Sequence, residues 1–119
     1  MKVKKMRLIL IVSAMVLVLI NTQAAHAKSC GFPPANNVVL PDGNTANREQ
    51  IQQAIAHVQT FASVMDTYLS CLDTNRESML MYMNKEQQTR WNEDYDKNVE
   101  ALSSLQNSLN EQIRIFNSK

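Results

Sequence analysis

Residues 47–83 have the sequence NREQIQQAIAHVQTFASVMDTYLSCLDTNRESMLMYM. Apolar side chains recur in this stretch every three or four residues, the spacing that gathers them on one face of an α-helix. The stripe consists of Ile51, Ile55, Val58, Ala62, Met65, Leu69, Leu72, Met79 and Met83, with Arg76 as its polar member. Asn47 followed by Gln50 is a capping-box pattern, which is typical of a helix start. We therefore expect a helix over residues 48–82.

The following residues repeat the same pattern. Asn84 and Gln87 form a second capping-box pattern, so we expect another helix over residues 85–117. Its apolar stripe consists of Trp91, Tyr95, Val99, Leu102, Leu105, Leu109, Ile113 and Phe116. Thr74 and Glu77 also match the capping pattern, so a break in the first helix near Thr74 is an alternative. We favour one continuous helix, because the apolar stripe passes this point without a change of phase.

The two stripes match each other when the chain is folded back between Met83 and Asn84. An antiparallel pairing about that turn places Met65 opposite Leu102, and Arg76 opposite Trp91. The stem of Arg76 can then pack on the indole ring, with the guanidinium over its face. The sequence thus predicts an all-α fold, a long antiparallel two-helix hairpin.

Glycine and proline are rare and confined to one segment. Two glycines and three prolines occur among 119 residues, all between Gly31 and Gly43. β-Sandwiches, dinucleotide-binding turns and glycine-rich phosphate loops need such residues at several places along the chain. We therefore exclude these classes for residues 44–119.

Residues 1–27 are typical of a cleaved signal peptide. Four basic residues precede the apolar run 8–20, and the small-residue site Ala25-His26-Ala27 follows. The run has 13 residues, which is short for a bilayer-spanning helix, although an uncleaved membrane anchor is the alternative. Cleavage would leave 92 residues with 8 basic and 11 acidic side chains, a net charge of −3. That charge argues against nucleic-acid binding, and the mature chain would be periplasmic or secreted, with no membrane segment.

Cys30 and Cys71 are the only cysteines. An exported chain meets an oxidising compartment, so we expect these two residues to form a disulfide. Free thiols or an intermolecular bridge are the alternatives. A redox-active pair would be closely spaced, so we do not interpret this pair as a catalytic dithiol.

The predicted disulfide implies an extended arm over residues 28–46, before the helical domain at 47–119. The arm must travel along the first helix from Cys71 back to Asn47, and its length suffices only if it is extended. We expect it to cover a second stripe made of Ala54, His57, Phe61, Val64, Tyr68 and Cys71. The covering residues would be Phe32, Pro33, Pro34, Val38, Val39 and Leu40. Residues 41–44, Pro-Asp-Gly-Asn, then form a reversing turn.

Short motifs along the chain resemble a family of small, exported, uncharacterised bacterial helical-hairpin proteins. They are the Cys30-Gly-Phe-Pro-Pro arm, the Pro41-Asp-Gly turn, Tyr68-Leu-Ser-Cys71-Leu, and the tail from Tyr95 and Val99 to Asn110-Glu-Gln-Ile-Arg-Ile-Phe116. Asn84-Lys85 departs from the family, in which a turn containing proline is expected. The resemblance implies export and a disulfide-linked helical hairpin. It implies no catalytic residue.

Residues capable of catalysis are few. After signal cleavage His57 is the only histidine, so no Ser-His-Asp, Cys-His or zinc-binding set can form, and we predict no enzymatic activity and no cofactor. Glu93, Asp94 and Asp96 lie beside Lys97 and are interpreted as a solvated helix face. His57 is expected to be half-buried near Leu40, and a ligand or pH-sensing role is the alternative.

Two functional hypotheses remain. The helix faces are rich in Asn and Gln, which favours a non-enzymatic binding or structural protein of the bacterial envelope. Its partner would be a second copy or another envelope protein. The alternative is a periplasmic Cu(I)-handling or other metal-handling protein that uses Met79, Met81 and Met83, because thioethers are soft ligands. In a regular helix, however, Met81 would point away from the other two.

We expect the protein isolated from the cell envelope to begin at Lys28 and to carry its disulfide, because the signal and both cysteines point to export. Intact-mass measurement with and without a reductant checks both points, since reduction adds two hydrogen atoms to the chain. A mass that retains residues 1–27 would contradict the export prediction.

Overall fold

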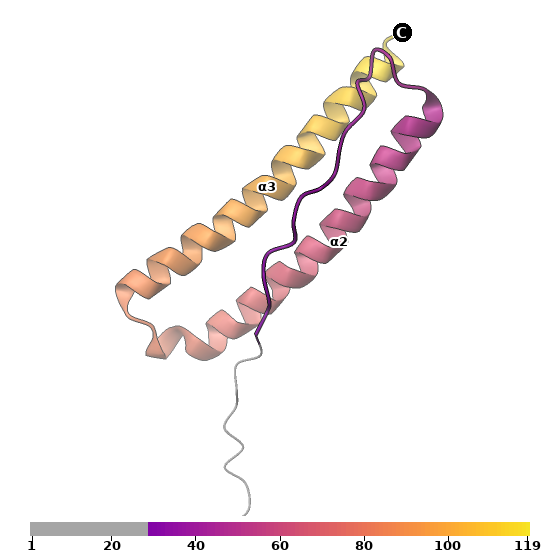
Figure 1. Cartoon of the computed structure of the whole chain (residues 1–119). Coiled ribbons are helices and arrows are strands. Elements are labelled where there is room, and N and C mark those ends of the chain that lie inside the picture. Colours follow the sequence, from indigo (N-terminus) through magenta and orange to yellow (C-terminus); the bar gives the residue numbers. More distant parts are fainter. Residues whose placement is uncertain (1–28) are drawn as a thin grey trace, which may run out of the picture.

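The computed structural model describes residues 29–119 and is helical, with no strand in this range (Figure 1). Helix α2 covers Arg48–Met79, the short 3-10 helix η1 covers Leu80–Tyr82, and α3 covers Lys85–Asn117. The predicted all-helical fold with two long helices is therefore confirmed. The predicted signal peptide at residues 1–27 lies outside the described residues.

Both long helices begin at the predicted capping boxes. The Asn47 side chain accepts the Gln50 backbone N–H at 2.9 Å, and the Gln50 side chain accepts the Asn47 backbone N–H at the same distance. Asn84 and Gln87 make the same reciprocal pair. These bonds satisfy backbone N–H groups that the first turn of a helix leaves without a partner.

The possible break near Thr74 is absent, because the Thr74 hydroxyl donates to the Ser70 carbonyl inside a continuous α2. The α-helix ends at Met79, three residues before the predicted end at 82, and continues as η1. The chain must become extended at Met83 to place Asn84 in its capping conformation. A tighter 3-10 turn is a common way to end a helix before such a change.

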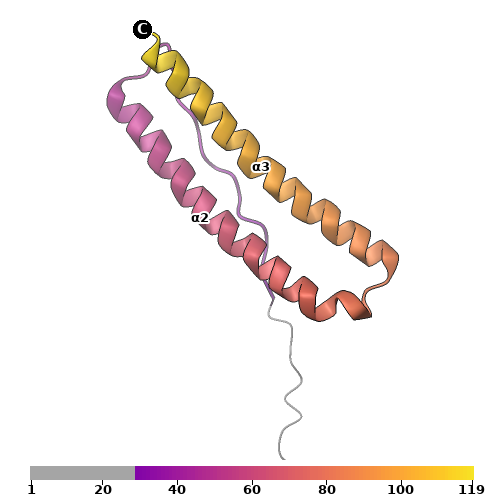
Figure 2. The same ribbon diagram turned by 180° about the vertical axis from the view of Figure 1, so that it is seen from behind.

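Helices α2 and α3 lie side by side, with the C-terminal end of α3 beside the start of α2 (Figures 1 and 2). The guanidinium carbon of Arg76 lies 5.1 Å from the centre of the Trp91 ring, as the sequence predicted. Trp91 stacks in turn on Tyr95, whose hydroxyl donates to Asp73 at 3.2 Å. These contacts connect the last turns of α2 with the first turns of α3.

The core is concentrated on α2, which is packed on two sides, by α3 and by the arm. The central cluster consists of Ala54, Val58, Phe61, Met65 and Leu69 from α2 with Leu105 and Leu109 from α3. Met65 is its most buried side chain. Val99, predicted to belong to the apolar stripe of the second helix, is instead 41% exposed. It follows Tyr95 by one full turn, and the gradual rotation of the stripe carries it past the contact edge.

The arm runs between α2 and α3 in both views and meets α2 near its Cys30 end (Figures 1 and 2). Val38 and Leu40 pack against the core cluster, as predicted. Phe32 and Val39 do not: they are 94% and 85% exposed, so the prediction that they cover α2 is wrong. Successive side chains of an extended chain point to opposite sides, so Val39 must face outward when its two neighbours face inward.

The turn that joins the arm to α2 is packed against the end of α3. The side-chain carboxylate of Asp42 accepts a hydrogen bond from the backbone N–H of Asn44. The backbone carbonyl of Asp42 accepts hydrogen bonds from the N–H groups of Thr45 and Ala46. The N–H of Gly43 donates to the side-chain oxygen of Gln112 at 2.7 Å. A Cβ atom on Gly43 would overlap the Gln112 carbonyl oxygen. Glycine is therefore required here by the close approach of two backbones.

Replacing Gly43 with Ala should lower the free energy of unfolding by about 1–3 kcal/mol, because the added methyl group forces the turn away from α3. Chemical denaturation followed by circular dichroism measures this change. Asn44→Ala is the matched control, since Asn44 is exposed in the same turn and its loss should cost less than about 0.5 kcal/mol. Equal effects of the two substitutions would contradict the role assigned to Gly43.

Candidate functional site

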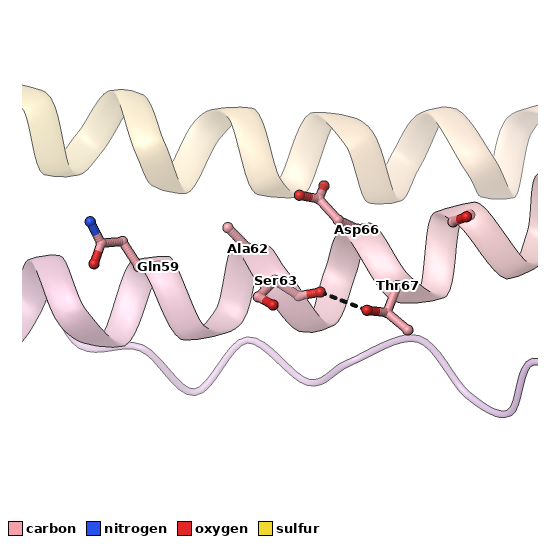
Figure 3. Close-up of a pocket in the computed structure, with 6 residues that line it drawn as sticks. Gln59, Ala62, Ser63, Asp66 and Thr67 are labelled. Atoms are coloured by element: carbon pink, nitrogen blue, oxygen red, sulfur yellow. Dashed lines mark hydrogen bonds between the residues drawn. The ribbon is translucent and has the colours of Figure 1, made fainter.

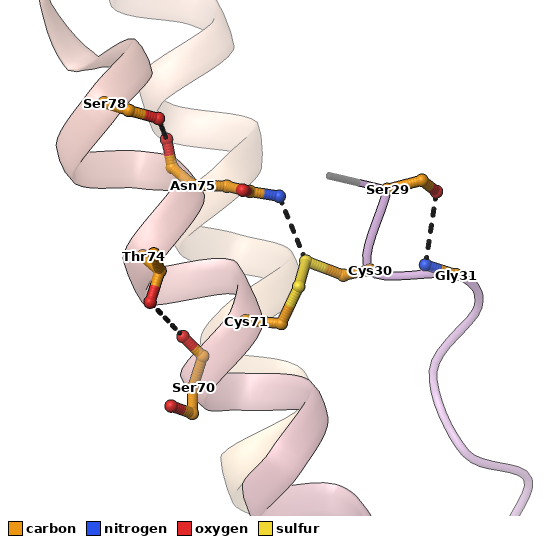
Figure 4. The surroundings of a disulfide bond; sticks show 8 residues. All are labelled: Ser29, Cys30, Gly31, Ser70, Cys71, Thr74, Asn75 and Ser78. Atoms are coloured by element: carbon orange, nitrogen blue, oxygen red, sulfur yellow. Dashed lines mark hydrogen bonds between the residues drawn. A yellow bond between two sulfur atoms is a disulfide. The ribbon is translucent and has the colours of Figure 1, made fainter. Parts of the chain in front are cut away.

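The disulfide joins Cys30 of the arm to Cys71 of α2, as the sequence predicted (Figure 4). It closes a loop with a sequence separation of 41 residues. The side-chain amide of Asn75, one turn further along α2, donates to the sulfur of Cys30 at 3.1 Å. Gly31 has a φ of 73°, a conformation that favours glycine and lets the chain turn directly after Cys30.

Between Gly31 and Pro41 the arm is held only by side-chain packing. Within residues 29–119, no backbone hydrogen bond joins this segment to either helix. Ordering a residue costs about 1–2 kcal/mol, whereas burying a Val or Leu side chain fully returns only about 1.5–3 kcal/mol. Val38 and Leu40, both only half-buried, cannot offset the cost for the nine residues 32–40. The order of the arm therefore depends on the attachments at its two ends, the disulfide at Cys30 and the turn at Gly43.

Two open hollows lie where the arm meets α2, on either side of His57. The larger, of about 420 Å³, is lined by Pro34, Ala35, Asn37, Val38, His57, Thr60, Phe61 and Val64. The smaller, of about 220 Å³, is lined by Val39, Leu40, Pro41, Gln50, Gln53, Ala54 and His57. His57 itself is exposed, so the prediction of a half-buried histidine is wrong. The arm leaves it open because Val38 and Leu40 turn toward the core instead.

A third hollow, of about 620 Å³, lies on the outer face of α2 (Figure 3). Its lining consists of Gln59, Ala62, Ser63, Asp66, Thr67 and Ser70. Small side chains along one helix face make this depression. The Thr67 hydroxyl donates to the Ser63 carbonyl at 3.0 Å, so it is used within the helix. No histidine lines the hollow to act as a general base for a hydroxyl nucleophile.

The carboxylates singled out in the sequence are exposed on α3. Glu93, Asp94 and Asp96 are all on the surface, in agreement with a solvated face. Partial burial, then the hydrogen bond to Asp73, then the negative charges of Asp73 and Asp96 raise the pKa of Tyr95 above its ordinary value. Tyr95 therefore keeps its proton and acts as a hydrogen-bond donor between the helices. Among residues 29–119, no three His, Cys, Asp or Glu side chains are placed to hold a metal ion.

The largest run of exposed apolar side chains is Met79–Tyr82, which we call the apolar tip. Met79, Leu80, Met81 and Tyr82 are 42%, 40%, 81% and 79% exposed. The tip forms the connection between the long helices, beyond the contact of Arg76 with Trp91. Its exposure follows from this position, since neither helix nor the arm extends past it (Figure 1). Methionine side chains are flexible and polarisable, and they adapt to varied partner surfaces.

The three candidate metal ligands lie in and beside this tip. Met79 ends α2, Met81 lies in η1, and Met83 is extended and half-buried. Met79 and Met81 therefore remain in helical turns, in which residues two apart point to different sides, and only Met83 is released from that spacing. The side chain of Gln88 donates to the Met83 carbonyl at 3.0 Å, which ties the base of the tip to the first turn of α3.

The opposite end of the molecule contains contacts that the sequence analysis missed. Besides the bond between Gly43 and Gln112, the ammonium group of Lys119 donates to the Ala46 carbonyl at 3.1 Å. The same ammonium lies 5.1 Å from the centre of the Phe116 ring. The sequence signal for these contacts is Gly43 in the reversing turn, because a glycine in a turn sometimes marks a close approach of two backbones.

Neither long helix of the described region is apolar enough over a sufficient length to cross a bilayer. No protein family, curated protein or solved structure matches this chain. The features of the molecule that bear on its function are therefore the exposed tip, the disulfide-linked arm and the distribution of charged groups.

Proposed function

We propose that this chain is a small, exported, non-enzymatic binding or structural protein of the bacterial envelope, periplasmic or secreted. In this proposal it acts as an antiparallel two-helix hairpin whose arm is tied down by the disulfide, in line with the resemblance stated above. The observation that carries the proposal is the apolar tip, four consecutive exposed apolar residues at one end of a long helical pair.

A binding role is supported by the chemistry of the tip. Scattered exposed apolar residues are ordinary on a protein surface, whereas a contiguous group is a common mark of an interaction site. Tyr82 adds an aromatic ring with a polar end, a side chain that is frequent at protein interfaces. Met79 and Met81 add adaptable apolar contact.

The placement of the titratable groups supports a role without catalysis. His57 lies beside an arm segment, residues 29–41, that carries no charge. Glu93, Asp94 and Asp96 face solvent on another helix. General acid–base catalysis needs such groups within hydrogen-bond reach of one reacting atom.

The partner would be another envelope protein or a second copy of this chain. A standard protein–protein interface uses about 20–30 residues on each side, so four tip residues alone are too few for a stable interface with either partner. We favour a partner with a pocket that encloses the tip together with the helix ends beside it. A second copy would have to pack along the Asn- and Gln-rich helix faces instead.

A photo-crosslinking residue placed at Met81 should form an adduct in intact cells, because the tip is the proposed contact. The same residue at Asn107, an exposed position on α3, is the control and should form little or none. Tyr82→Asp should reduce the Met81 adduct without altering thermal stability, since Tyr82 is mostly exposed. Mass spectrometry identifies the partner, and an adduct of twice the chain mass identifies a second copy. Equal adducts at both positions would contradict the proposal.

Copper handling is the second candidate, favoured by one observation. Between Met79 and Met83 the backbone changes from α-helical to 3-10 to extended, so helical spacing no longer fixes the thioether of Met83 relative to those of Met79 and Met81. Soft thioether ligands suit Cu(I).

If the methionines bind copper, replacing Met79, Met81 and Met83 together by Leu should weaken Cu(I) binding at least tenfold. Leucine keeps the apolar volume but removes the sulfur. Competition with a chromogenic Cu(I) chelator measures the affinity. Met65→Leu, in the core, is the matched control. An unchanged affinity in the triple variant would eliminate the copper role.

A further inference from the structure

We propose that the Cys30–Cys71 disulfide is a thiol-controlled latch: reducing it releases residues 30–41 from α2 and uncovers the apolar surface beneath, while both helices stay folded. This inference is independent of the proposed partner. It follows from a difference in contacts: the arm has few contacts besides the disulfide, whereas the two helices have many contacts with each other.

The arm has one covalent attachment and otherwise weak ones. Along residues 32–40 it makes no backbone hydrogen bond to either helix of the described chain, and it contains no charged residue that could form an ion pair. Only Val38 and Leu40 pack against the core cluster. At its far end, the turn is held by the bond between Gly43 and Gln112. Cutting the disulfide therefore removes the covalent attachment of the Cys30 end to α2.

The helices, in contrast, are held by contacts that do not involve the arm. Each has its own capping box. Met65 and Leu69 belong to the same buried cluster as Leu105 and Leu109. Nearer the tip, Arg76 lies over Trp91, and Tyr95 donates to Asp73. Loss of the arm leaves all these contacts in place.

The disulfide is accessible to a reductant. Cys30 and Cys71 are only half-buried, and the neighbouring Ser29 and Gly31 are exposed (Figure 4). A protein or small-molecule dithiol is the required reductant. Its thiolate attacks one sulfur of the disulfide, and the other sulfur leaves as a thiolate and takes up a proton. The second thiol of the reductant then breaks the mixed disulfide. The protein gains two electrons and two protons, and the reductant becomes a disulfide.

Release of the arm changes the surface of α2. Ala54 and Phe61 are buried in the closed form, and Tyr68 is half-buried. The hollows around His57 already separate parts of the arm from the helix. With the arm free, Phe61 and Tyr68 join Val64, which is already 50% exposed, in an apolar stripe at helical spacing that His57 separates from Ala54. Such a stripe can accept another extended, uncharged segment in place of the arm.

The test compares the mature chain with and without dithiothreitol. Reduction should lower the backbone ¹⁵N order parameters of residues 32–40 from about 0.85 to below about 0.6, and fluorescence of an apolar dye should rise at least threefold. Met65 and Leu105 should remain protected from hydrogen exchange, although less strongly than before, because reduction also removes the loop-closure contribution of the disulfide, and the helical circular-dichroism signal should stay unchanged. The double variant Cys30→Ser/Cys71→Ser should show the same behaviour without dithiothreitol. Phe32→Ala, which alters an exposed arm residue, should keep the arm ordered until the reductant is added.

Two results would overturn the latch. If residues 32–40 keep their order parameters after reduction, side-chain packing alone holds the arm. If Met65 and Leu105 lose protection together with the arm, the disulfide supports the whole fold and is no latch. Neither result depends on the crosslinking experiment, so the latch and the binding role can fail separately.

Discussion

The covalent bond between Cys30 and Cys71 is the constraint on which the packing of α2 depends. An extended, uncharged segment without backbone hydrogen bonds to its neighbours has little to offset its loss of conformational entropy. In the chain-entropy model, closing a loop of about 40 residues contributes about 4 kcal/mol, mainly by restricting the unfolded chain. The bond keeps Val38 and Leu40 on α2, and these side chains complete a core that two helices alone would leave open on one side.

The two ends of the molecule differ in how tightly they are packed. At the end of the molecule that contains the reversing turn, Gly43 approaches the backbone of α3 too closely for any other residue to fit. At the same end, the Lys119 ammonium donates a hydrogen bond to the Ala46 carbonyl. At the other end, the chain passes through η1 with its apolar side chains in solvent. This difference between a closely packed end and an exposed end is the reason why we propose the tip as the contact surface.

Local chemistry explains which features could be predicted. Capping boxes involve residues three apart, so Asn47 and Asn84 marked both helix starts without knowledge of the fold. The apolar period marked the core of α2, and a single pair of cysteines left one intramolecular pairing. The contact of Arg76 with Trp91 followed from aligning two stripes about a turn. The apolar tip was visible as a methionine-rich run, but its exposure was not.

What the sequence by itself determined is the helical state of residues 48–79 and 85–117, the two helix starts and the disulfide, because each depends on neighbouring residues or on residue counts. Tertiary structure alone decided that His57, Phe32 and Val39 face solvent, since their orientation depends on which neighbours the arm places inward. It also decided that Gly43 lies against Gln112, a contact between residues 69 positions apart. The physical reason is range: hydrogen bonds within one turn are encoded locally, whereas close packing depends on segments that meet only in the folded chain.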